Sequence, residues 1–198
     1  DLTAAKVRGV RPSTILRVGG LRIALLGLIQ TEKESGIPSS HPARLEGMHF
    51  FDGLEYAKKL PPLRQGADVA IVLSHLGLEV DTKLAAAVPG IDLIVGGHSH
   101  TMIAEAMDVN GVLIAQAGGD GQYLGRIDLT IQDGRIVEKR GTLIDLRKET
   151  AEDPVVRTMI TRFEANPSLN TVIGHVGRPL AGKSELEDRK STRLNSSH

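Results

Sequence analysis

The chain has 198 residues, and its 24 lysines and arginines balance 24 aspartates and glutamates, so a nucleic acid duplex is not an expected partner. The absence of cysteine excludes disulfides, thiolate metal sites and a cysteine nucleophile, so any metal must be bound by histidine, carboxylate or amide groups. Three phenylalanines, two tyrosines and no tryptophan are too few for a base-stacking surface, and the apolar runs are far shorter than the ~20 residues of a membrane span.

The first predicted elements are typical of an α/β protein. Leu21–Ile29 is a continuous apolar run, which predicts a strand buried on both faces. Glu32–His49 is rich in glycine, proline and serine and predicts a loop. Phe51–Leu60 has apolar residues at nearly helical spacing and precedes Pro61, which predicts a short helix that ends there.

The centre of the chain predicts a βαβ unit. Asp68–Ser74 and Ile91–Val95 are buried-strand patterns, and Val80–Val88 between them has apolar residues at helical spacing. Two strands joined by such a crossover are parallel, with a right-handed connection. Their carboxyl ends therefore lie at one edge of the sheet, where open α/β sheets bind ligands.

Three histidines follow these two strands. His75 comes directly after the first strand, and His98 and His100 follow the second one, after a pair of glycines. Small residues leave room for an ion, and an extended backbone would direct the side chains at i and i+2 the same way. We expect the three imidazoles to face a common space and bind metal. The alternative is that they only cap strand ends.

Downstream, the pattern changes to antiparallel strands. Asn110-Gly111 and Asp133-Gly134 are typical hairpin turns. The strands predicted around them form a second sheet and are Ile103–Val109, Val112–Ala117, Leu124–Ile131 and Arg135–Leu146.

Asp153-Pro154 predicts the start of a helix that ends before Asn166. Thr171–Val176 predicts one further strand. The segment 183–198 is polar, which predicts a disordered tail. Its end, Ser191–His198, resembles translated adaptor or vector sequence more than native protein, so we leave it out of the functional argument.

Four segments carry a family resemblance: Ile71–Gly77, Gly90–Ile94, Gly96–Thr101 and Gln116–Gly125. Together they resemble the two-metal, calcineurin-like metallophosphoesterases of the 5′-nucleotidase family, over about Arg11 to Leu180. The resemblance implies an α/β fold that is a fragment of a four-layer α/β/β/α sandwich, with a dinuclear metal centre at the carboxyl edge of the sheets.

The resemblance also implies ligands and an activity. His75 and His98 would bind one divalent ion and His100 the other, with Mn, Zn, Co, Fe and Ni all compatible with imidazole. The implied reaction is the hydrolysis of nucleoside 5′-monophosphates or related small phosphoesters, in a periplasmic or extracellular protein. No catalytic residue is assigned. For Gln116 and Asp120, a position beside the metal ligands and a plain turn or strand-end role both remain open.

The family motifs D-x-H, G-D and G-N-H-[D/E] do not precede these segments. We therefore expect 1–150 to be the C-terminal part of the catalytic domain, 151–168 a linker helix, 169–182 the start of a truncated C-terminal domain and 183–198 the tail. Such a fragment would be inactive alone. Same-fold alternatives are a cyclic-nucleotide phosphodiesterase, a nucleotide-sugar hydrolase and a thiosulfohydrolase. A hypothesis from a different functional class is a non-catalytic metal- or partner-binding module. The genomic sequence upstream of Asp1 would distinguish it from an enzyme, because an enzyme requires the D-x-H and G-N-H-[D/E] motifs there.

Overall fold

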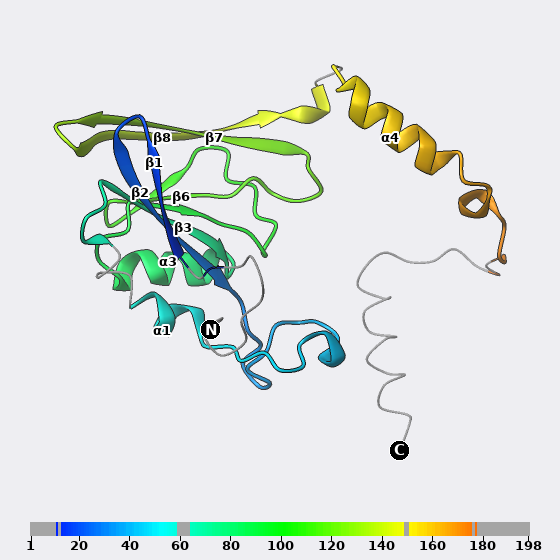
Figure 1. Ribbon diagram of the computed structural model, residues 1–198, viewed down its shortest axis with the longest axis horizontal. Helices are drawn as coiled ribbons and strands as arrows, with labels where there is room; N and C mark the ends of the chain where they lie inside the picture. Colours follow the sequence, from blue (N-terminus) through cyan, green and yellow to red (C-terminus); the bar gives the residue numbers. More distant parts are fainter. Residues whose placement is uncertain (1–10, 12, 59–63, 149–150, 176, 178–198) are drawn as a thin grey trace. The chain divides into compact units, whose positions relative to one another are not determined.

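The structure, a computed structural model, describes residues 11, 13–58, 64–148, 151–175 and 177 (Figure 1). The chain divides into two compact units, Asp1–Glu149 and Thr150–His198. Within the described ranges, none of the helices has both the length and the apolar character needed to cross a membrane.

The first unit is built on a six-stranded mixed sheet. Its strands are β1 (Ser13–Val18), β2 (Leu21–Ile29), β3 (Val69–His75), β4 (Leu93–Val95), β5 (Met107–Val109) and β6 (Val112–Ala115). Their order across the sheet is β1-β2-β3-β4-β6-β5. The four central strands are parallel, and β1 and β5 pair antiparallel at the edges. The predicted parallel pairing of β3 with β4 is therefore confirmed.

Helices α1 (Gly53–Ala57) and α3 (Leu78–Ala87) pack on one face of this sheet (Figure 1), and a 3-10 turn, η1 (Pro42–Arg44), lies in the predicted loop. The core residues Leu26, Val72, Ile94 and Ile114 are register partners across the four parallel strands. They pack in one cluster with Leu84 of α3. Burial of each such side chain stabilises the fold by about 1.5–3 kcal/mol. The predicted helix Phe51–Leu60 is shorter than expected, and its last two residues lie outside the described ranges.

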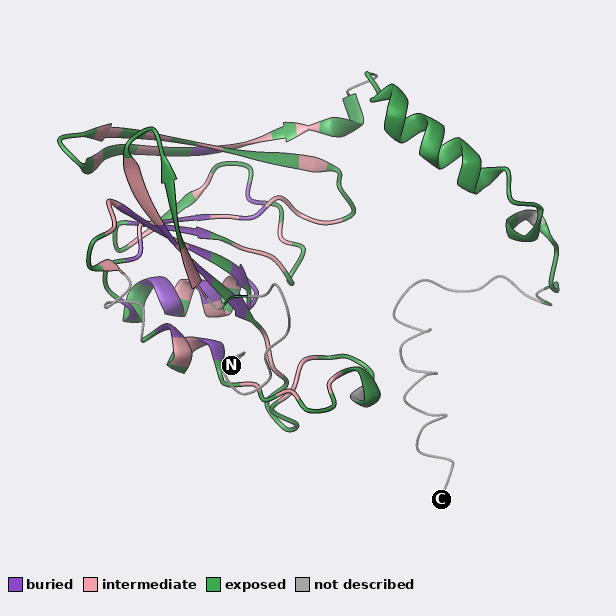
Figure 2. Cartoon of the chain, viewed as in Figure 1, coloured by how far each residue is buried: buried purple, intermediate pink, exposed green. Residues whose placement is uncertain are grey.

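The opposite face of the sheet is only partly covered (Figure 2). We predicted that Leu21–Ile29 is buried on both faces, and this is wrong: Ile29 is 47% exposed, and Leu73 and Val95 on the neighbouring strands are 48% and 37% exposed. The second sheet contacts β6, which two strands separate from β2. The second sheet therefore covers this face near β6 and leaves it partly exposed at β2.

The second sheet is a single hairpin of β7 (Tyr123–Gln132) and β8 (Arg135–Asp145), joined at the predicted Asp133-Gly134 turn. The assignment of Ile103–Val109 and Val112–Ala117 to this sheet is wrong, because β5 and β6 join the first sheet and β6 lies parallel to β4. All three residues of the apolar run Val112–Ile114 are buried, as is typical of an interior parallel strand. The described residues of this unit form three layers, α/β/β; they do not supply the outer helical layer of the expected sandwich.

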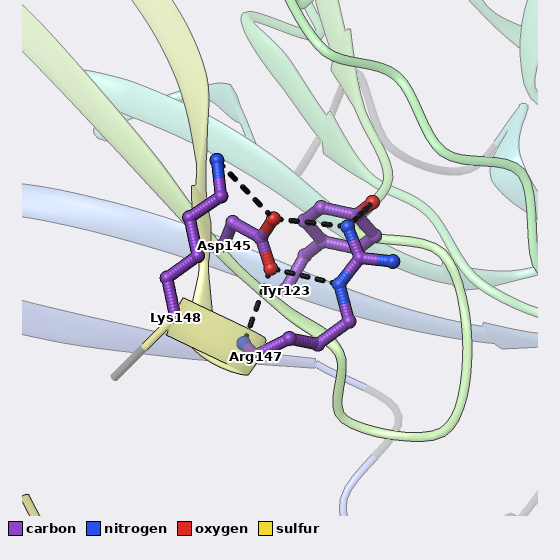
Figure 3. A network of polar contacts seen from close by, with 4 residues as sticks. All are labelled: Tyr123, Asp145, Arg147 and Lys148. Atoms are coloured by element: carbon purple, nitrogen blue, oxygen red, sulfur yellow. Dashed lines mark hydrogen bonds and ion pairs between the residues drawn. The ribbon is translucent and has the colours of Figure 1, made fainter. Parts of the chain in front are cut away.

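A polar network closes the open end of the hairpin (Figure 3). The Asp145 carboxylate accepts hydrogen bonds from Nε and Nη2 of Arg147 at 2.9 Å each, and Lys148 Nζ lies 3.7 Å away. Arg147 also donates to the Tyr123 hydroxyl at 2.7 Å. These contacts connect the short helix η2 (Leu146–Lys148) to the first residue of β7.

The second unit contains α4 (Pro154–Glu164) and η3 (Pro167–Asn170). The predicted helix start is confirmed, since Asp153 Oδ1 accepts hydrogen bonds from the backbone N–H groups of Val155 and Val156. The predicted strand Thr171–Val176 is wrong, because residues 171–175 are exposed and have no strand structure; Val176 is outside the described ranges. The predicted tail at 183–198 also lies outside them.

Candidate metal centre

His75 and His98 come together at the carboxyl edge of β3 and β4. His75 is the last residue of β3, and His98 lies in the loop that follows β4. The two imidazole rings meet edge to face, with centroids 5.2 Å apart and planes at 70°. This juxtaposition follows from the parallel pairing of the two strands.

The histidine loop, which we define as Gly96–Thr101, is not extended as predicted. His98 and His100 have backbone φ angles of +71° and +52°, in the left-handed region. His98 is the central residue of a tight turn, in which Ser99 N–H donates to the Gly97 carbonyl at 2.9 Å. Left-handed backbone costs a residue with a side chain about 1–2 kcal/mol, so other contacts must hold the loop in place.

A glycine lies against each of the three histidine rings. A Cβ placed on Gly97 would lie 3.2 Å from His75 Nδ1, and one on Gly119 would lie 3.0 Å from the His100 ring. A Cβ placed on Gly77 would lie 3.4 Å from Cδ2 of the His98 ring. The absence of a side chain at these three positions leaves space around the imidazoles. The contact with Gly119 also shows that His100 lies beside the turn that follows β6.

Gln116, just beyond β6, supports the histidine loop from below the surface. Its side chain is buried, with 3% of the residue exposed. The carboxamide contacts Gly97, Ser99 and Thr101 of the loop. Of the two alternatives left open for Gln116, the structure favours a position beside the histidines, whereas Asp120 is an exposed turn residue with a φ of +58°.

Asp81 is a buried carboxylate beneath the same edge. It lies in the first turn of α3 and is 0% exposed. Burial raises the pKa of the Asp81 carboxyl, against an opposing hydrogen bond from Ser74. Its Oδ2 atom has no hydrogen-bond partner and lies 2.7 Å from where a Gly96 Cβ would be. The sequence signal was its spacing with Leu84 and Val88, which places Asp81 on the apolar face of the helix.

The imidazole nitrogens at this edge are suitable ligands for a divalent transition metal, but they do not form a complete site. Imidazole nitrogen is a common ligand of Zn, Mn, Co, Fe and Ni, and the glycines leave the rings unobstructed. Among the described residues, however, no group of three or more His, Asp or Glu side chains is arranged to hold an ion. The structure pairs His75 with His98 and places His100 against Gly119, so these residues offer donors but not a complete coordination sphere.

Comparison with known proteins gives relatives of one kind. No family model matches the chain. The trifunctional nucleotide phosphoesterase protein YfkN of Bacillus subtilis is 29% identical over 197 residues, which are 96% of this chain and 13% of that protein. A snake venom 5′-nucleotidase of Naja atra is 30% identical over 182 residues, which are 81% of this chain and 34% of the enzyme. The chain is a homologue of the 5′-nucleotidases.

Solved structures agree with this homology. A 5′-nucleotidase precursor of Thermus thermophilus matches with a TM-score of 0.67 and 27% identity, over 86% of this chain and 37% of the other. The sulfate thiohydrolase SoxB of Thermus thermophilus matches with a TM-score of 0.67 and 26% identity, over 86% and 30%. The resemblance to 5′-nucleotidases and the α/β fold class are thereby confirmed. The chain spans little more than a third, at most, of each of these four proteins.

Proposed function

We propose that this chain is part of a metal-dependent hydrolase of nucleoside 5′-monophosphates or related nucleotides. The observation that carries the proposal is the pairing of His75 with His98 at the ends of two parallel strands, in a homologue of 5′-nucleotidases. The pair lies where open α/β sheets bind ligands. The names of the relatives supply the substrate class, since they include a nucleotide phosphoesterase and several 5′-nucleotidases.

We further propose that His75 and His98 hold one divalent ion and His100 contributes to a second. Such ions lower the pKa of bound water and neutralise charge on a phosphoryl group. The chain's own residues orient the imidazoles: β3 and β4 bring two rings together, and Gly77, Gly97 and Gly119 leave space around them. Because relatives include a nucleotidase precursor and venom enzymes, we propose that the protein acts outside the cytoplasm.

Titration with Co²⁺ tests the ligand assignment on the 198-residue chain. We expect visible absorption from bound Co²⁺, and we expect His75→Ala and His98→Ala each to abolish it. His175→Ala is the matched control, because His175 is exposed and belongs to the second unit. Absorption that all three variants retain would contradict the assignment.

Hydrolysis is tested on the full-length gene product with Mn²⁺ and adenosine 5′-monophosphate. We expect His98→Ala to reduce turnover at least ~100-fold, while the 198-residue chain alone has no appreciable activity, because three imidazoles leave two ions under-coordinated. Turnover that is insensitive to His98→Ala would exclude this function for the site.

A sulfate-ester or thiosulfate substrate is the second candidate. The structural match to the sulfate thiohydrolase has the same TM-score as the match to the nucleotidase precursor. Sulfate and phosphate groups are both tetrahedral oxyanions, and a centre that binds one can accommodate the other. Parallel assays with adenosine 5′-monophosphate and a thiosulfate ester would separate the two candidates by their relative kcat/KM.

A further inference from the structure

We propose that Gln116 is a positioning residue: its carboxamide holds the histidine loop in the conformation that presents His98 and His100 to the metal centre. This inference rests on the proposed function and adds a residue that contacts neither ion nor substrate. The argument starts from the partners of the carboxamide.

The two ends of the Gln116 side chain bind opposite sides of the histidine loop. Nε2 donates to the Gly97 carbonyl at 3.2 Å. Oε1 accepts from Ser99 Oγ at 3.0 Å and from the Thr101 backbone N–H at 2.5 Å. All three partners alternate along the chain with His98 and His100, so each histidine lies between two fixed neighbours.

Only a carboxamide of this length can make all three contacts. A glutamate has the same shape, but its second oxygen would face the Gly97 carbonyl, which also only accepts hydrogen bonds. The Gln116 side chain is buried, so water does not readily replace a partner that its carboxamide loses. A leucine would leave the Ser99 hydroxyl and the Thr101 N–H without this acceptor.

Ser99 extends the contact to the helix that follows β3. Its hydroxyl accepts a hydrogen bond from Leu78 N–H, at the start of α3, at 3.2 Å, and lies 2.9 Å from Thr101 Oγ1. Gln116, the histidine loop and the first turn of α3 are therefore one connected network. His75 is three residues before Leu78, so the network reaches the segment that follows the first histidine.

The loop requires such a contact because its backbone is unfavourable by itself. His98 and His100 both have positive φ angles, which residues with side chains rarely adopt without support from their surroundings. Without the carboxamide, the loop would relax toward an extended backbone, and the rings would point in new directions.

The test compares Gln116→Glu with Gln132→Glu, an equal change of charge at an exposed position at the end of β7. The first readout needs no metal: amide hydrogen exchange of Thr101, whose N–H is bound by Gln116. We expect faster exchange at Thr101 in Gln116→Glu and no change in Gln132→Glu, with both variants folded by circular dichroism.

The second readout is Co²⁺ affinity and the position of the cobalt absorption band. We expect Gln116→Glu to weaken binding about 10–100-fold and to shift the band, as loss of a residue that orients ligands does. Ser99→Ala, which removes an exposed hydroxyl of the same network, is the second variant in case Gln116→Glu does not fold. It should weaken binding in the same direction by a smaller factor, with wild-type circular dichroism.

The outcomes separate the two proposals. If the wild-type chain binds Co²⁺ and folded Gln116→Glu and Ser99→Ala bind it equally well, the positioning role is excluded and the proposed function stands. If the wild-type chain binds no Co²⁺, the proposed metal centre is excluded. The exchange measurement then decides alone: an unchanged exchange rate of the Thr101 amide in Gln116→Glu would show that Gln116 does not hold the histidine loop.

Discussion

Ser74 donates a hydrogen bond to the buried carboxylate of Asp81, and Ser74 is the residue directly before His75. The same hydroxyl accepts from Leu76 N–H at 3.2 Å, on the other side of His75. The backbone that carries the first histidine is thus joined to the first turn of α3. The Asp81 carboxyl that makes this connection is fully buried, and burial raises its pKa. The stability of this edge of the sheet therefore depends on pH.

Asp81→Asn should remove a pH-dependent loss of stability. Because burial raises the folded-state pKa of Asp81 above 3.8, the folded protein binds more protons than the unfolded chain over that range. The free energy of unfolding should therefore fall as pH rises from about 3.8 through the folded-state pKa, and this fall should be absent from the Asn variant. Urea unfolding at a series of pH values measures the difference, and parallel curves for the two proteins would contradict it.

Asp145 should have the opposite effect. Hydrogen bonds from Arg147 lower the pKa of Asp145 from 3.8 to about 2 (Figure 3). Its stabilising contribution is complete above pH 3.8 and is lost as the pH falls toward 2. Asp145→Asn should therefore flatten the acid limb of the stability curve between these values and leave the range above about pH 5 parallel to wild type. An unchanged acid limb would show that this network does not stabilise the hairpin.

Gly96→Ala should destabilise the first unit by about 1–3 kcal/mol, as overpacking of a buried site does. Its Cβ would lie 2.7 Å from Asp81 Oδ2 and 3.1 Å from Gln116 Nε2, two buried atoms that have little room to move. Gly27→Ala is the matched control, because it has no neighbour within 4 Å of a new Cβ and no positive φ. Thermal unfolding of both variants is the measurement, and equal melting temperatures would refute the packing argument.

Gly141→Ala should loosen the contact of the hairpin with the six-stranded sheet, again by about 1–3 kcal/mol. A Cβ at this position would lie 2.5 Å from the Ala106 Cβ, whereas one at Gly125 on the paired strand would lie no closer than 3.8 Å to another atom. Hydrogen exchange of the Ala106 N–H, which donates to the Gly141 carbonyl at 3.0 Å, reports the contact directly. We expect faster exchange in Gly141→Ala and wild-type exchange in Gly125→Ala.

The βαβ unit and the edge that carries the histidines could be predicted from the sequence because local patterns determine them. The apolar runs before His75 and His98 specify strands, and the helix between them specifies parallel pairing. The sheet to which β6 belongs could not be predicted, since the Asn110-Gly111 turn only requires that β5 and β6 pair with each other. The expected alternation of His98 and His100 failed because both residues have positive φ angles. The side-chain contacts of this loop come from Gln116 and Leu78, which lie outside it.

The same reason explains why the sequence leaves two roles open for Gln116. Its loop partners lie 15 to 19 positions away in the sequence, and nothing in an isolated amide at the end of an apolar run indicates them. Asp81 was detectable in principle, because an acidic residue on the apolar face of a helix must find a partner or remain protonated.

The left-handed backbone at His98 and His100 also limits how this motif can be transferred. Six residues with the sequence Gly-Gly-His-Ser-His-Thr, grafted onto another sheet, would lack the amide from the neighbouring strand and the helix start that hold them. The graft would adopt whatever backbone its new host favours. A transferable unit must therefore extend from β3 through Gln116, which means that its smallest portable form is a piece of tertiary structure.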